Sequence, residues 1–308
     1  MRIAILCNDR MALPALKYLI HSKQVVAIGM SDRITETQQL IRSWCGPENL
    51  PFRSFSKKEF ASSLLAWLNE YQPDVVFVKT FPYLIPSEAL AFPAYGFINF
   101  HYAPLPAWRG SNPLFWMLRN GVKTGGVTVH EMSSRYDEGP ILLEQPVPIG
   151  HNINFGILNT QLAHTGLHLT MQLVNNFCAV FQQRKKQDHS KAGWYDQPKA
   201  ADLFINWETM DAADVLALVR ACNPWNKGAA TRWKDWTFGI SYASMGDHVA
   251  VDISPGTILS IDAGAGFTIV SRDHRAVVAE VVYCEEGYFP GYCLSAFGLQ
   301  KNDQLVSG

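Results

Sequence analysis

Ile3-Ala4-Ile5-Leu6-Cys7 is an apolar run with the length of one β-strand. Residues 11–22 then space their leucines at helical intervals, and residues 25–30 form a second apolar run. A strand–helix–strand order is typical of a parallel sheet covered by helices. The turn Asn8-Asp9-Arg10 contains no glycine, whereas a dinucleotide-binding turn needs Gly-x-Gly-x-x-Gly. The first 30 residues therefore predict an α/β fold. The missing glycine motif argues against a dinucleotide-binding site.

The same alternation of strands and helices continues through most of the chain. Further strands are predicted at 74–79, 96–101, 124–132 and 140–149, and further helices at 57–71, 87–91 and 154–184. After a helix at 211–222, five short strands are predicted at 237–244, 248–253, 257–261, 267–271 and 276–284. We therefore expect a Rossmann-like α/β domain with a mostly parallel sheet at residues 1–188, a linker at 189–203 and a small OB-like β-barrel at 204–308.

Composition narrows the class of protein. The 308-residue chain has a net charge of −1, which argues against extensive nucleic-acid binding because that requires a basic surface. It contains no apolar run of about 18 residues, the length that spans a membrane, and its first residues lack the pattern of a signal peptide. The six cysteines are scattered without a Cys-x-x-Cys pair, so neither a metal site nor a disulfide framework is predicted. A reducing cytoplasm is the expected location.

Polar side chains mark the end of the run at 96–101. Asn99 and His101 are two residues apart, so in a strand they point to the same face. Pro104 and Pro106 end the strand directly after them, at the carboxyl end where α/β sheets bind ligands. Each residue also has an ordinary structural explanation: a strand-end Asn can satisfy a turn, and a half-buried His usually belongs to the core. His130, on a later strand, is interpreted as structural.

Several motifs together resemble one enzyme family. Asn99-x-His101, Leu-Pro-x-Trp-Arg-Gly at 105–110, Gly-Val-Thr at 126–128 and Asp137-x-Gly139 are similar to motifs of enzymes that transfer a formyl group from 10-formyltetrahydrofolate. The later motifs resemble the carboxy-terminal domain of methionyl-tRNA and sugar formyltransferases: Ile-Asn-Trp at 205–207, Asn-Pro-Trp at 223–225, Pro-Gly-Thr-Ile at 255–258 and Gly-Leu-Gln-Lys-Asn-Asp at 298–303. The resemblance covers nearly the whole chain and implies a formyltransferase with 10-formyltetrahydrofolate as co-substrate and no metal.

This resemblance implies catalytic roles for three residues. An amine attacks the formyl carbon, and negative charge develops on the formyl oxygen. Asn99 would donate an N–H to that oxygen, and protonated His101 would add a charged donor. Asp137 would raise the pKa of the His101 imidazole, fix its orientation and accept the proton that leaves the amine, directly or through water.

The resemblance also implies a folate site, mostly through backbone groups. It would use two loops and the turn after His101, at Tyr83, Leu84, Ile85, Ser133, Ser134, Arg135, Tyr136, Ala103, Pro104 and Leu105. Many relatives have Gly-Ser-Leu-Leu-Pro after the histidine, whereas this chain has Tyr102-Ala103-Pro104-Leu105-Pro106. It therefore lacks the serine hydroxyl, and Pro104 has no backbone N–H.

The acceptor is not fixed by these motifs. Methionyl-tRNA formyltransferases carry a basic, glycine-containing loop after the second strand, but residues 31–44 are short and mix Asp32 and Glu36 with Arg33 and Arg42. We therefore expect a small-molecule amine as acceptor, either a nucleotide-linked amino sugar or an amino-acid-derived metabolite. The alternatives are methionyl-tRNA formylation with a tRNA partner, hydrolysis of formyltetrahydrofolate, and folate binding without catalysis. A homodimer is possible in each case.

Overall fold

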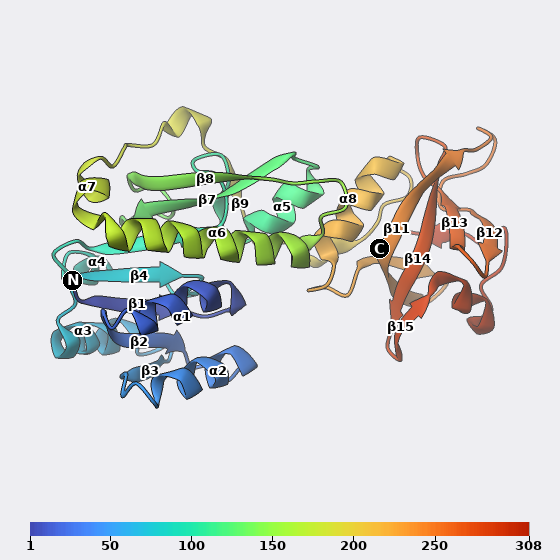
Figure 1. Cartoon of the computed structure of the whole chain (residues 1–308). Helices are drawn as coiled ribbons and strands as arrows, with labels where there is room; N and C mark the ends of the chain where they lie inside the picture. The colour runs from blue at the N-terminus through green and yellow to red at the C-terminus, as the bar shows by residue number, and fades with distance from the viewer. Residues whose placement is uncertain (308) are drawn as a thin grey trace. The chain divides into compact units, whose positions relative to one another are not determined.

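The computed structural model describes residues 1–307 and is shown in Figure 1. Cα packing groups the chain into two compact units. The first contains residues 1–110, 124–148 and 159–195, and the second contains 111–123, 149–158 and 196–308. Two short segments from the middle of the chain thus group with the second unit, whereas the prediction gave the second domain one continuous range, 204–308.

The first unit is built on a seven-stranded sheet with the order β3-β2-β1-β4-β5-β7-β8. The first five strands of this order are parallel, and β7 and β8 are antiparallel to their neighbours, so the predicted α/β class with a mostly parallel sheet is confirmed. The strands are β1 (Ile3–Cys7), β2 (Val25–Ser31), β3 (Phe52–Phe55), β4 (Val75–Lys79), β5 (Phe97–His101), β7 (Thr124–Glu131) and β8 (Ile141–Pro148).

Helices connect these strands. α6 packs over β4, where the buried Lys79 Nζ donates to Thr170 Oγ1 at 3.0 Å. The predicted helix at 154–184 is in fact two helices, because the chain leaves helical geometry at Asn176. The helices are α1 (Leu13–His21), α2 (Glu36–Cys45), α3 (Phe60–Tyr71), α4 (Ser87–Leu90), α6 (Phe155–Asn175) and α7 (Phe177–Gln182).

Two elements of this unit, α2 and β3, were not predicted. Thr35 starts α2 because its Oγ1 accepts the N–H of Gln38 at 3.1 Å. The helix buries only four residues, two of them polar, so few apolar side chains mark it in the sequence. Residues 31–44 therefore form the end of a strand, a turn and most of a capped helix.

The second unit is an antiparallel sheet with the order β12-β13-β14-β11-β10-β16, and β15 pairs with β14. An isolated bridge between Thr257 and Gln304 links the two ends of this order, so the sheet curls back on itself as the predicted half-closed barrel. Its elements are α5 (Pro113–Arg119), α8 (Ala212–Cys222), β10 (Ala229–Trp233), β11 (Trp236–His248), β12 (Ile258–Asp262), β13 (Gly266–Val270), β14 (Arg275–Cys284), β15 (Gly287–Pro290) and β16 (Leu305–Val306).

The prediction of a separate strand at 248–253 is wrong. β11 runs on to His248, and a turn follows it. β10, β15 and β16 were missed because they are short or contain tryptophan and proline in place of an apolar alternation. Within residues 1–307, no helix combines the length and the apolar character needed to cross a bilayer.

Candidate active site

The pairing of β5 with β7 brings three polar side chains to one face of the sheet. In this antiparallel pair Asn99 lies opposite His130, and His101 lies opposite Thr128. Opposed residues share a face, and so do residues two apart along one strand. Asn99, His101 and His130 are therefore neighbours at the carboxyl end of β5.

A carboxylate from the loop after β7 meets these side chains. Asp137 Oδ1 lies 3.7 Å from His101 Nδ1 and 3.6 Å from His130 Nε2. Its Oδ2 accepts the backbone N–H of Gly110 at 3.0 Å, and its side chain is only 12% exposed. The structure thus brings together the three residues predicted as catalytic, and it adds His130, which the sequence analysis had set aside.

Backbone carbonyls fix the tautomers of both imidazoles. A carbonyl only accepts, so His101 Nε2–H donates to the Trp108 oxygen at 2.6 Å and His130 Nδ1–H donates to the Glu131 oxygen at 2.9 Å. In neutral His130 the remaining nitrogen, Nε2, accepts from Asn99 Nδ2 at 3.1 Å. His130 therefore orients the Asn99 amide, whose second N–H is left for another acceptor.

The charge on this cluster differs from the expectation. Burial lowers the pKa of His101 below its ordinary value of 6.5, and the Asp137 carboxylate only partly offsets this. Burial by itself raises the pKa of Asp137, but the two imidazoles and the Gly110 N–H outweigh it and hold that pKa well below the ordinary 3.8. The resting site therefore pairs an ionised Asp137 with a neutral His101, not with the protonated His101 that we expected.

These pKa shifts predict how stability depends on pH. The folded pKa of His101 lies below the ordinary 6.5, so below that pH the unfolded chain gains a proton that the folded chain does not. This contribution to stability is present above pH 6.5 and is lost as the pH falls, whereas that of Asp137 is lost only below about 3.8. We expect the free energy of unfolding, measured in urea, to fall between pH 7.5 and 5. It should fall less in His101→Gln and as in wild type in His164→Gln, an exposed control; equal slopes in all three proteins would contradict the burial of a neutral imidazole.

The loop that carries Asp137 is held in an unusual conformation. Asp137 has a φ of 51°, in the left-handed region that few non-glycine residues adopt. Gln187 Nε2 donates to the carbonyl oxygens of both Asp137 and Gly139 at 2.8 Å. A Cβ at Gly139 would lie 1.8 Å from the Glu131 oxygen, so only glycine lets this loop approach β7.

A buried arginine holds Gln187 in turn. Arg109 is 1% exposed, and its Nη2 donates to Gln187 Oε1 at 2.7 Å. Its Nη1 lies 3.4 Å from Oε1 of Glu138, the residue that follows Asp137 in the chain. Arg109 stands on β6 (Arg109–Gly110), which pairs with β9 (Trp194–Tyr195). Arg109 and Gln187 together position the Asp137 loop, although Gln187 is 50 positions from Asp137 in the chain.

Replacing Gln187 by Leu removes both loop hydrogen bonds and also one of the acceptors of Arg109. For the formyl transfer that the sequence motifs imply, we expect kcat to fall about 10- to 100-fold, the effect of a small misplacement of a catalytic group, with little change in KM for the implied formyl donor. Gln187→Glu should fail to restore kcat, because a carboxylate cannot donate to the two carbonyls. Steady-state kinetics measure the effect, and Gln182→Leu, which changes an exposed glutamine, is the control. A Gln187→Leu protein that is less stable but keeps the wild-type kcat would refute the positioning role.

The residues predicted to bind folate lie in three places. Tyr83 packs its ring on Phe60 and donates its hydroxyl to Asp32, Ile85 is buried, and Leu84 is 53% exposed. Ala103 and Leu105 are buried with backbone groups bonded to Thr128 Oγ1, and Pro104 lies between them. Ser133, Ser134, Arg135 and Tyr136 form a largely exposed turn closed by Ser133 Oγ and the Arg135 backbone. Their role in folate binding remains a prediction.

Two parts of the site were missed in the sequence. His130 is two residues after Thr128 in a predicted strand, so the two side chains point to the same face. Pairing that strand with 96–101 would have placed His130 beside Asn99. Gln187 carries no comparable signal, since it lies in an irregular segment within a polar run.

Comparisons with known proteins identify the family of this chain. Residues 2–174 match the family model described as formyl transferase, and residues 198–285 match the formyl transferase C-terminal domain. A methionyl-tRNA formyltransferase from Desulforamulus reducens is 30% identical over 295 residues, covering 91% of this chain and 90% of the relative.

Solved structures share the fold at lower identity. An N-formyltransferase from Helicobacter canadensis, in complex with folinic acid and dTDP-3-aminofucose, has a TM-score of 0.69 at 16% identity, covering 91% of this chain and 98% of the other. HypX from Aquifex aeolicus, in complex with tetrahydrofolic acid, has a TM-score of 0.67 at 19% identity, covering 97% of this chain and 47% of the other.

Proposed function

The chain belongs to the formyl transferase family, and we propose that it transfers a formyl group from 10-formyltetrahydrofolate to the α-amine of methionyl-tRNA. The observation that carries formyl transfer is the approach of His101 and His130 to the Asp137 carboxylate, with the Asn99 amide bonded to His130. The donor is supported by the folate compounds bound to two proteins of the same fold. The acceptor is supported by full-length relatives named as methionyl-tRNA formyltransferases.

The reaction follows from the charges at the site. The amine nitrogen forms a bond to the formyl carbon, and the free N–H of Asn99 stabilises the oxygen that becomes negative. The bond from that carbon to the folate nitrogen then breaks. The neutral His101 imidazole, whose Nδ1 lies 3.7 Å from Asp137 Oδ1, takes up the proton that the amine loses and then passes it to the folate nitrogen, so that tetrahydrofolate leaves in its neutral form. Asp137 stays ionised, because its low pKa makes it a weak base and a good partner for an imidazolium.

This acceptor replaces the preference drawn from the sequence, where a small-molecule amine came first. That amine is kept as a second candidate on one specific observation. The segment in which a basic tRNA-binding loop was sought forms α2 instead, and its first residue, Glu36, pairs with Arg10 at 2.7 Å. Such a pair lowers the positive charge available for RNA at this position.

A direct assay separates the acceptors. The purified chain is mixed with 10-formyltetrahydrofolate and either initiator methionyl-tRNA or a panel of nucleotide-linked amino sugars, and the products are identified by mass spectrometry. We expect formylmethionyl-tRNA and release of tetrahydrofolate. Formylation of an amino sugar alone would replace the first acceptor by the second. Release of tetrahydrofolate without any formylated amine would indicate hydrolysis and refute transfer.

A further inference from the structure

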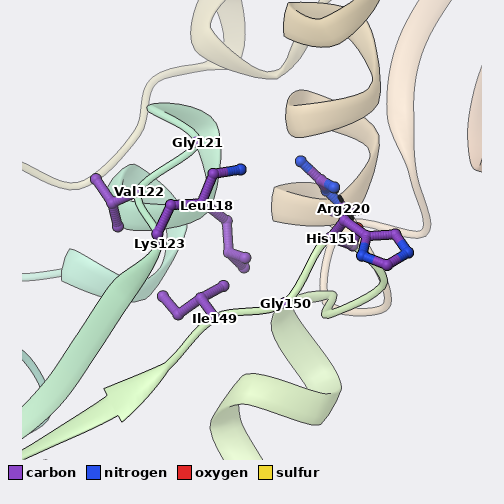
Figure 2. A pocket seen from close by; sticks show the side chains of 8 residues that line it. All are labelled: Leu118, Gly121, Val122, Lys123, Ile149, Gly150, His151 and Arg220. Atoms are coloured by element: carbon purple, nitrogen blue, oxygen red, sulfur yellow. Dashed lines mark hydrogen bonds between the residues drawn. The ribbon is translucent and has the colours of Figure 1, made fainter.

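A hollow in the second unit gathers basic side chains (Figure 2). It lies between the ends of α5 and α8 and the segments next to β7 and β8, and it is a shallow hollow that is partly open to solvent. Leu118, Val122 and Ile149 line one side of it, and Lys123, His151 and Arg220 supply nitrogen atoms. Among residues 1–307, the lining contains no Asp or Glu.

Arg220 in this hollow lacks a counter-ion. Within the described chain no carboxylate lies within 4.0 Å of it, and its Nη1 donates to the His151 carbonyl. Its Nε is buried and has no hydrogen-bond partner among residues 1–307. Burial lowers the pKa of the guanidinium, yet an arginine remains charged at neutral pH. A partly buried cation without an anion is unfavourable, because buried charges need a partner.

A second cation faces this arginine. Figure 2 shows the amine end of Lys123 and the guanidinium of Arg220 reaching toward each other from opposite walls. His151 lies beside the arginine with its imidazole directed away from Lys123. Two like charges that face each other across a hollow repel each other, and an anion between them would turn this repulsion into attraction.

We propose that this hollow binds a phosphate group. Once Nη1 bonds the His151 carbonyl and Nε is buried, Nη2 is the guanidinium nitrogen that remains to donate to a phosphate oxygen. Lys123 supplies a point charge to a further oxygen. The inference rests on the proposed function only in the choice of carrier, since both methionyl-tRNA and nucleotide-linked sugars contain phosphates.

Calorimetric titration of the full chain with inorganic pyrophosphate tests this, at constant ionic strength and without formyl donor or amine. We expect binding to wild type, and a dissociation constant raised at least about tenfold in Arg220→Gln and in Lys123→Gln, the loss of a charged hydrogen bond. Arg232→Gln and Lys301→Gln, exposed in the same unit, should bind as wild type does. Lys123 is itself exposed, and the hydrogen bond it makes within residues 1–307 uses its backbone carbonyl, so its variant stays informative even where Arg220→Gln fails to fold.

The outcome is independent of formyl transfer, because neither substrate is present. No pyrophosphate binding by wild type, or equal affinity in wild type and Lys123→Gln, would overturn the proposal. Competition then identifies the carrier. Displacement of pyrophosphate by uridine diphosphate assigns the site to a nucleotide, displacement by uncharged tRNA assigns it to a polynucleotide, and displacement by neither would also overturn it.

Discussion

Replacing Asp137 by Asn is expected to lower kcat for formyl transfer by about 100- to 10 000-fold, the range for removal of a proton-transfer partner. The amide keeps the shape of the carboxylate and still accepts the Gly110 N–H, which lies 3.0 Å from Oδ2. It removes the negative charge that stabilises a protonated His101 or His130, each less than 4 Å from Oδ1. Steady-state release of tetrahydrofolate measures the loss.

The control for this variant is Asp247→Asn, which removes one charge from an exposed position in the second unit. It should keep the wild-type kcat. Binding of 10-formyltetrahydrofolate by Asp137→Asn, measured by fluorescence, should change little, because the substitution acts on the transition state more than on the ground state. An Asp137→Asn enzyme that keeps more than about a tenth of the wild-type kcat would contradict the role of this carboxylate.

Replacing Asn99 by Ala is expected to lower kcat by about 100- to 1000-fold, the effect of deleting one donor to a developing oxyanion. The N–H that does not bond His130 is the donor in question. His130→Ala should have a smaller effect, because it frees the orientation of the amide but leaves the amide in place. Single-turnover rates of the two variants and of the double variant provide the measurement.

The double variant distinguishes a shared role from two separate ones. If His130 acts through Asn99, then adding His130→Ala to Asn99→Ala costs little more, and the two effects are not additive. Asn69→Ala, which removes an exposed amide from α3, is the control and should leave the rate unchanged. Full additivity would show that His130 acts on its own, through its contact with Asp137.

Most of the sheet of the first unit could be predicted because its strands are buried on both faces. β1 and β4 are buried along their whole length, so β1 appears as an unbroken apolar run and β4 as an apolar run that ends in Lys79. α2 could not be predicted, because its first turns are polar and its burial depends on tertiary packing around Gln38, whose amide donates to the Ser31 carbonyl. The break at Asn176 has no glycine or proline to mark it.

Part of the candidate site could be predicted from the sequence, and part of it could not. Asn99, His101 and Asp137 could be found because they lie at strand ends and in motifs with a known order. The protonation state of His101 could not, because it depends on burial and on a bond to the Trp108 carbonyl that no pattern shows. The contact of Gln187 with the Asp137 loop joins residues 50 positions apart, and only the fold brings them together.

The most direct test of the account is one comparison on His101→Ala, in which kcat for formyl transfer and the dissociation constant for 10-formyltetrahydrofolate are measured on the same preparation. If His101 acts in catalysis together with Asp137, then kcat falls at least about 100-fold and donor binding is nearly unchanged. A variant with kcat within a few fold of wild type would contradict the account, and so would a variant that loses donor binding and turnover in equal measure.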